Sequence, residues 1–165
     1  MRYLGVEREL SELIIRNILR TQGMTTLTMT GNSMEPILRE GDQVRVIEGA
    51  YSLGDILLYP YKENKILAHR WVGQRDQRLL CKGDNAFRVE DIELADVLGK
   101  VEAVYINGMW IHVPSVSDDM ITYSLELGHL FRKNTFNILQ TMHDPLFEVY
   151  KNILEEYAIY RSNEY

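Results

Sequence analysis

The stretch TGNSMEPILREGDQVRV, residues 30–46, places one serine, Ser33, between a glycine and a proline just ahead of an alternating segment. A serine hydroxyl becomes a nucleophile only when a base takes its proton, and histidine can act as that base near neutral pH. The alternative is an ordinary turn, because turns also favour Gly, Asn, Ser and Pro. Ser33 is therefore a candidate nucleophile that requires a base held against it.

The segment KILAHRWVG, residues 65–73, offers such a base. Its alternation predicts a strand in which His69 shares one face with Leu67 and Trp71. A histidine on a strand is held rigidly enough to meet a serine on a turn. His112, in MWIHV, is a second histidine on a predicted strand and is an alternative candidate for the base. A structural role is the alternative for both.

Hydrophobic periodicity divides the chain into three parts. Residues 1–24 have helical spacing up to Gly23, which predicts an N-terminal amphipathic helix. Residues 25–114 contain short apolar or alternating runs separated by turn signals, and Asn107-Gly108 predicts a hairpin. Residues 115–165 return to helical spacing. The predicted fold is mainly β, with an N-terminal amphipathic helix and a C-terminal helical extension.

The predicted elements can be named from their residues. The apolar face of the first helix is predicted to consist of Val6, Leu10, Leu13, Ile14, Ile18 and Leu19. The predicted strands are DQVRVIE, DILLYPY, KILAHRWVG, RLLCKG and the two arms of VEAVYINGMWIHV.

Composition excludes several classes of protein. The 165 residues carry a net charge of −6, which argues against a nucleic-acid partner. Cys81 is the only cysteine, so no intrachain disulfide can form. No apolar run is long enough for a transmembrane segment, and the N-terminus lacks the pattern of a secretion signal, so a cytoplasmic location is expected. No motif calls for a metal ion or another cofactor, and none is predicted.

Five blocks stand in order between residues 27 and 105: GNSMEP with a following GD, GDILLY, AHR, CKGDN and LGKV. Together they resemble the superfamily of type I signal peptidases and LexA-like self-cleaving repressors. The resemblance implies a β-rich catalytic fold with Ser33 as nucleophile and His69 as general base. Bacterial signal peptidases and LexA-like repressors have lysine at the base position. Histidine there resembles the branch of the endoplasmic-reticulum-type and archaeal signal peptidases.

The resemblance also implies an acidic residue that orients the histidine. In the histidine-containing branch this residue follows the Gly-Asp-Asn block. The segment GDNAFRVED is one residue longer than that pattern, which maps the role onto Asp91, with Asp84 as rival. Local turn hydrogen bonds are the alternative role of Asp84, and Asp96 is a remoter candidate.

Three residues around the nucleophile are assigned to substrate binding by the same resemblance. The backbone N–H of Ser33 would meet the oxyanion, and Gly31 would let the substrate backbone approach closely. Met34 would pack beside a small substrate residue, or would be an ordinary core methionine.

These residues lead us to expect a serine endopeptidase that cuts an extended leader- or signal-type peptide segment of a precursor in trans, bound as an added strand. The alternatives are a non-catalytic peptide-binding or regulatory module on the same fold, and a self-processing regulator. The segment before Ser33 contains no Ala-Gly pair of the kind that self-cleaving repressors cut. The C-terminal helices, residues 115–165, are expected to cover the β-domain, to recruit the precursor or a partner protein, or to mediate self-association.

Overall fold

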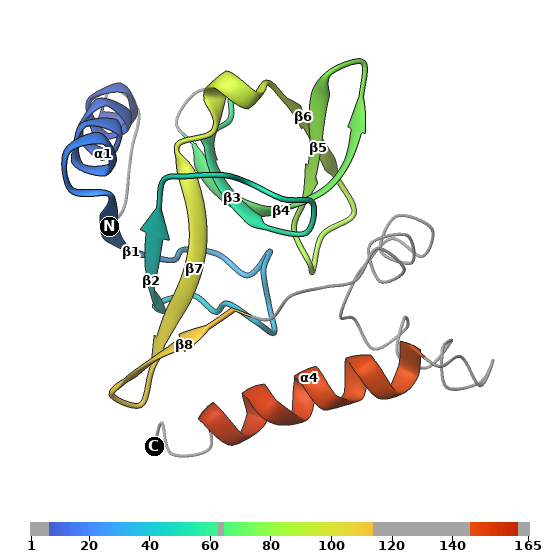
Figure 1. Ribbon diagram of the computed structural model, residues 1–165. Coiled ribbons are helices and arrows are strands. Elements are labelled where there is room, and N and C mark those ends of the chain that lie inside the picture. The colour runs from blue at the N-terminus through green and yellow to red at the C-terminus, as the bar shows by residue number, and fades with distance from the viewer. Residues whose placement is uncertain (1–6, 63–64, 114–145, 162–165) are drawn as a thin grey trace.

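The computed structural model describes residues 7–62, 65–113 and 146–161 of the chain (Figure 1). The described part is mainly β, as predicted, and its eight strands form one antiparallel sheet in the order β1-β2-β7-β3-β4-β5-β6, with β8 paired to β7. The elements are α1 (Glu7–Gln22), β1 (Met24–Thr28), β2 (Gln43–Ile47), β3 (Ile56–Pro60), β4 (Ile66–Arg75), β5 (Arg78–Lys82), β6 (Val89–Ile92), the 3₁₀ turn η1 (Leu94–Asp96), β7 (Gly99–Ile106), β8 (Met109–His112) and α4 (Leu146–Arg161).

The predicted N-terminal helix is present as α1, but the face that it buries differs from the prediction. The helix ends where expected, because Gly23 has a φ of 77° and its N–H donates to the Leu19 carbonyl. Ile15 and Leu19 are buried, whereas Leu13 and Ile14 are exposed. The prediction that Leu13 and Ile14 face the core is therefore wrong. Three consecutive apolar residues leave the orientation of a helix open, and contacts with the sheet decide it.

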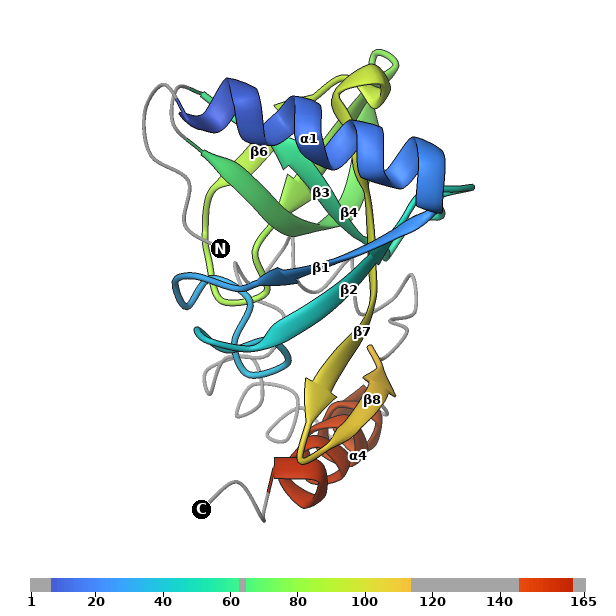
Figure 2. The ribbon, with the colours of Figure 1, turned by 90° about the vertical axis from the view of Figure 1, so that its left-hand side faces the viewer.

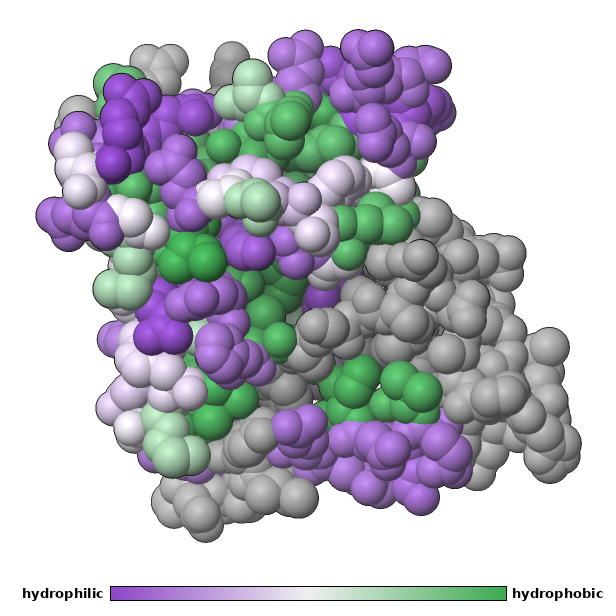
Figure 3. Space-filling view, viewed as in Figure 1, coloured by the Kyte–Doolittle hydropathy of each residue, from purple (hydrophilic) through white to green (hydrophobic). Residues whose placement is uncertain are grey.

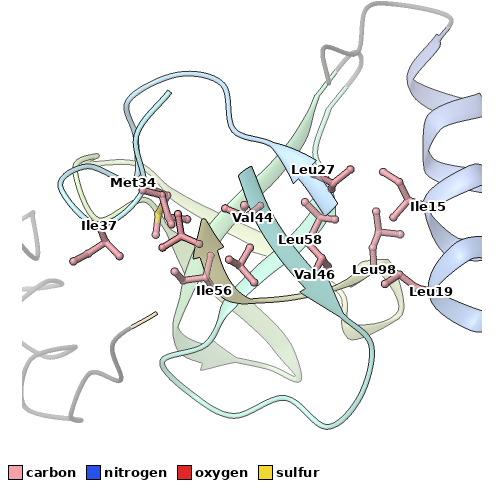
Figure 4. Packing of buried hydrophobic residues seen from close by; sticks show 14 of the residues in the cluster. Ile15, Leu19, Leu27, Met34, Ile37, Val44, Val46, Ile56, Leu58 and Leu98 are labelled. Carbon is pink, nitrogen blue, oxygen red and sulfur yellow. The ribbon is translucent and has the colours of Figure 1, made fainter. Parts of the chain in front are cut away.

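The central strand β3 separates two hydrophobic clusters. Ile56 and Leu58 belong to the larger cluster, which α1 closes at one end, while Leu57 and Tyr59 belong to the smaller one. Successive side chains of a strand point to opposite faces, so an uninterrupted apolar run fits a strand that is covered on both sides. Figure 4 shows that the larger cluster extends from Ile15 and Leu19 of α1 to Met34 and Ile37 of the loop after β1.

The β7–β8 hairpin forms as its sequence predicts. Ile106 pairs with Met109, and the two intervening residues, Asn107 and Gly108, have φ values of 51° and 80°. Positive φ at both central positions is what a type I′ turn requires. Two strands were not predicted. β1 has a single buried side chain among threonines, and β6 is four residues long with a glutamate facing inward.

The helix α4 packs against the loop between β1 and β2. Ile153 contacts the larger hydrophobic cluster, and the buried Arg161 donates to both carboxylate oxygens of Asp42 and to the Ile37 carbonyl, at 2.8–3.2 Å. The outer edge of α4 is hydrophilic (Figure 3). The view at right angles places α4 at the end of the sheet where β7 and β8 meet, opposite α1 (Figure 2). The predicted helical segment before α4, residues 124–142, lies outside the described residues.

We expect Arg161→Met to destabilise the fold by about 3 kcal/mol, the usual size of the loss when one partner of a buried ion pair is removed. The side chains of Arg161 and Asp42 are 4% and 11% exposed. Urea unfolding followed by circular dichroism measures the difference in stability. Lys151→Met is the matched control on the same helix, because the Lys151–Glu155 pair is largely exposed and such pairs contribute less than about 1 kcal/mol. Equal midpoints for the two variants would contradict docking of α4 through Arg161.

Candidate active site

Ser33 lies on a turn of the loop between β1 and β2, and the residues that follow Ser33 anchor this turn in the hydrophobic core. Its neighbour Met34 is buried in the larger cluster together with Ile37 and Leu38. The Leu38 N–H donates to the Met34 carbonyl, which closes the turn. Burial of the following residues therefore orients Ser33 toward the sheet and leaves its side chain half-buried. Of the two roles considered for Met34, the structure shows that of a core methionine, since Met34 does not line the cavity beside Ser33.

His69 of β4 meets Ser33 as predicted. The distance between the Ser33 Oγ and the His69 Nε2 is 2.8 Å, and His69 is buried. The strand holds the ring in place, because β4 is paired to β3 with His69 opposite Leu57. His112 lies exposed on β8, so the alternative of His112 as the partner of Ser33 is not met.

The other ring nitrogen of His69 contacts Glu90, a carboxylate that was not predicted from the sequence. Glu90 of β6 accepts a hydrogen bond from the His69 Nδ1 through its Oε1, and the same oxygen accepts one from the Tyr59 hydroxyl at 2.9 Å. Glu90 is buried. An ionised carboxylate only accepts, so it places the proton of a neutral imidazole on Nδ1. The Nε2 lone pair is then free to accept the Ser33 hydroxyl proton.

The surroundings of Glu90 keep it ionised. Burial alone would raise the pKa of this carboxyl, but the hydrogen bonds from His69 and from the Tyr59 hydroxyl and the charge of Arg88 together hold the pKa below its ordinary value. Burial, with Cys81 and Glu90 adding to it, raises the pKa of Tyr59, so this phenol keeps its proton and remains a donor. Ser33, His69 and Glu90 therefore form a continuous chain of hydrogen bonds that ends in a negative charge.

The prediction that Asp91 or Asp84 orients His69 is wrong. Strand β6 has the alternating burial pattern exposed–buried–exposed–buried, so Glu90 faces inward while the exposed Asp91 pairs with Arg78 across the β5–β6 ladder. Asp84 is buried, but both of its oxygens accept from Arg70, at 2.7 and 2.8 Å. The remoter candidate, Asp96, lies in the turn η1. Alternation in RVEDI could have identified Glu90 if the strand had been recognised.

The Lys-Gly-Asp-Asn block braces the nucleophile. The backbone N–H of Asn85 donates to the Ser33 carbonyl at 2.8 Å, and the Asn85 side-chain amide donates to the Asn32 carbonyl. A Cβ on Gly83 would lie 2.6 Å from the Ser33 carbonyl oxygen, so a side chain there would displace the nucleophile. Arg70 follows His69 in β4 and binds Asp84, which precedes Asn85. The strand that carries His69 is therefore linked directly to the turn that holds Ser33.

A cavity of about 420 Å³ opens beside the Ser33–His69 pair. It lies between two segments of the chain, residues 27–33 and 65–69, and Gly31 is part of its wall. The role of Gly31 in the close approach of a substrate stays a prediction. The lining residues are Leu27, Thr28, Met29, Thr30, Gly31, Asn32, Ser33, Val44, Leu58, Lys65, Ile66, Leu67, Ala68, His69 and Arg88.

Both segments beside the cavity offer unpaired backbone. Among the described strands, β1 is the first of the sheet order and pairs only with β2. β4 pairs with β3 from Ile66 to Arg70, but its ladder with β5 begins only at Arg70. Within the described part of the chain, the other edge of residues 66–69 therefore has no strand partner. The Ser33 N–H likewise donates no hydrogen bond to another described residue.

Comparison with known proteins adds nothing to this geometry, since no protein-family model and no curated protein matches the sequence. No helix of the described residues is long and apolar enough to cross a membrane. Among the same residues there is also no group of three or more His, Cys, Asp or Glu side chains placed to hold a metal ion.

A buried lysine adds to the buried charges near the site, which include Arg70 and Asp84. Lys82 of β5 is 2% exposed, and burial lowers its pKa to about 8, although Asp84 and Glu90 act in the opposite direction. The folded protein thus binds this proton less tightly than the unfolded chain does, and the cost of charging the buried amine is fully present below pH 8.

We expect Lys82 to make stability rise with pH between about 8 and about 10.5, by up to about 3 kcal/mol, since one unit of pKa difference corresponds to about 1.4 kcal/mol. The measurement is the difference in unfolding free energy between the natural chain and Lys82→Met at several pH values. Burial also raises the pKa of Cys81, to about 12, which lowers stability in the alkaline range of both proteins. Because both proteins contain Cys81, its contribution cancels in the difference between their unfolding free energies. If this difference did not change with pH, the expectation for Lys82 would be contradicted.

Proposed function

We propose that this chain is a serine endopeptidase, similar to the signal peptidase and LexA-like superfamily, that cuts an extended peptide in trans. The observation that supports this most directly is the chain of contacts from Ser33 through His69 to Glu90 beside an open cavity. Nucleophile, base and orienting carboxylate in this order are the recognisable arrangement of an activated serine. Four of the five ordered sequence blocks support the same assignment: GNSMEP carries Ser33, AHR carries His69, GDILLY supplies the Tyr59 contact to Glu90, and CKGDN holds the Ser33 carbonyl.

The proposed reaction follows from the positions of the protons. The Ser33 oxygen attacks the carbonyl carbon of the scissile bond while its proton passes to the His69 Nε2. Glu90 stays ionised and stabilises the imidazolium that forms. The Ser33 N–H donates to the developing oxyanion. His69 then protonates the leaving amine, and an ester between Ser33 and the substrate remains. Water attacks this ester with His69 again as the base, which releases the acid and restores Ser33.

Binding of an extended substrate is supported by the two open strand edges. A peptide lying between residues 27–33 and 65–69 can exchange backbone hydrogen bonds with either segment, as in recognition by strand addition. Affinity from the main chain is largely independent of sequence, so side-chain preferences depend on the walls of the cavity. The proposed substrate is therefore a leader- or signal-type segment that is extended when it binds.

We expect Ser33→Ala and His69→Ala to lose peptide cleavage by at least about 10³-fold while keeping the fold, because each removes one half of the proton-transfer pair. Cleavage of a random-sequence dodecapeptide mixture, read by mass spectrometry, measures activity, and circular dichroism checks the fold. Labelling by a fluorophosphonate at Ser33 would support the assignment directly. Equal cleavage by the natural chain and by Ser33→Ala would refute it.

A second expectation separates Glu90 from its neighbour. Glu90→Gln should lower kcat by about 10²–10⁴-fold, since an amide no longer fixes the Nδ1 proton or balances the imidazolium. Asp91→Asn is the matched control one residue away and should cleave at nearly the natural rate, because the Asp91 side chain pairs with the partly exposed Arg78 and not with His69. The reverse order of losses would show that Glu90 is structural and that another carboxylate acts on His69.

A further inference from the structure

The charged side chains that line the cavity are basic, whereas the chain as a whole has a negative net charge. The 165 residues include 24 acidic and 18 basic side chains, for a net charge of −6. The residues that line the cavity include no aspartate or glutamate, whereas Lys65 and Arg88 are both among them. Two cations therefore line the cavity of a chain with an excess of carboxylates, and the ionised Glu90 lies next to this lining, in contact with His69 and Arg88.

Lys65 is placed to meet a side chain of a bound strand. It precedes β4 and is four residues before His69, which corresponds to about 13 Å along a strand. The period of two places Lys65 on the same face of the chain as His69. Its side chain is exposed. A peptide that runs beside residues 65–69 would therefore present a side chain to Lys65 about four positions from the bond at Ser33.

Arg88 places a second positive charge closer to the reacting pair. Its Nε lies 3.5 Å from the Glu90 Oε2, and its guanidinium lies 5.3 Å from the centre of the Tyr61 ring. The Arg88 side chain is nevertheless 53% exposed. The Arg88 guanidinium can therefore bind a carboxylate of a peptide in the cavity while it stays stacked on the Tyr61 ring.

We propose that the peptide taken by this site is acidic: it carries Asp or Glu within about four residues of the bond at Ser33, facing Lys65 and Arg88. This inference rests on the proposed function, because it names the side chains preferred by the same site. Opposite charges on neighbouring strands stabilise their pairing, whereas like charges destabilise it. Basic peptides are accordingly disfavoured at the same positions. The attraction occurs at a partly exposed site, so added salt weakens it.

Peptide binding tests this inference without requiring cleavage. Immobilised Ser33→Ala protein is incubated with an equimolar mixture of dodecapeptides that differ only by Glu, Gln or Lys at one position, and the retained peptides are quantified by mass spectrometry. The expected result is retention in the order Glu, Gln, Lys, with the difference reduced at 0.5 M salt. Retention that does not depend on charge, or that favours Lys, would overturn the inference.

The double variants Ser33→Ala/Lys65→Glu and Ser33→Ala/Arg75→Glu assign the preference to the cavity. Arg75 is exposed at the far end of β4 and does not line the cavity, so the Arg75 substitution makes the same change in net charge elsewhere on the same strand. We expect Lys65→Glu to abolish or reverse the preference for Glu and Arg75→Glu to leave it intact. Equal effects of both substitutions would show attraction by overall charge only, and would also overturn the inference.

Cleavage by the natural chain separates failure of the inference from failure of the proposed function. Cleavage of the same mixture without a preference for acidic peptides would reject the acidic substrate and leave the peptidase assignment standing. Retention of acidic peptides by Ser33→Ala, without cleavage by the natural chain, would support the charge preference and reject the peptidase.

Discussion

The geometry of the candidate site depends on the buried ion pair between Arg70 and Asp84. Both side chains are at most 2% exposed, the pair is bidentate, and Arg70 also donates to the Gly54 carbonyl. Removing two charges from water is costly, and only such complete pairing offsets the cost. The pair joins the strand that carries His69 to the turn whose Asn85 holds the Ser33 carbonyl. The 2.8 Å contact between Ser33 and His69 thus joins the Ser33 turn to β4. The Arg70–Asp84 pair holds these two segments together, and Arg70 is the residue next to His69.

Some parts of the fold and of the candidate site could be predicted from the sequence, and others could not. The β3 run, the Asn107-Gly108 hairpin and the Ser33–His69 contact follow from local patterns or from the order of blocks. The orienting carboxylate does not, because the prediction relied on the spacing of a pattern that is one residue longer here. Spacing locates a loop, but only the pairing of β6 with β5 decides which side chain of Val89–Ile92 points inward. A shift of one residue in a strand exchanges its faces, and Glu90 takes the place expected for Asp91.

Other differences have the same physical origin. The sequence of α1 contains more apolar residues than one face can bury, so its orientation is set by tertiary contacts and not by periodicity. Strand β1 has one buried leucine among threonines and gives a weak signal, yet its last two residues, Leu27 and Thr28, line the cavity. Features that lie at edges and depend on long-range pairing are those that local sequence patterns specify least. At this site they are also the features closest to the place where a substrate would bind.

The contact between Arg161 and Asp42 also bears on the order in which the molecule can be completed. The two residues are 119 positions apart, and Asp42 lies in the segment that connects the Ser33 turn to β2. At a synthesis rate of about 5–20 residues per second, about 6–24 s separate the appearance of the two. During that interval the Asp42 carboxylate lacks its buried cation, and the loop that carries Ser33 lacks one of its supports. The loop that carries Ser33 therefore gains this support only after residue 161 has been made, long after the strands β1 to β8 on which the loop lies.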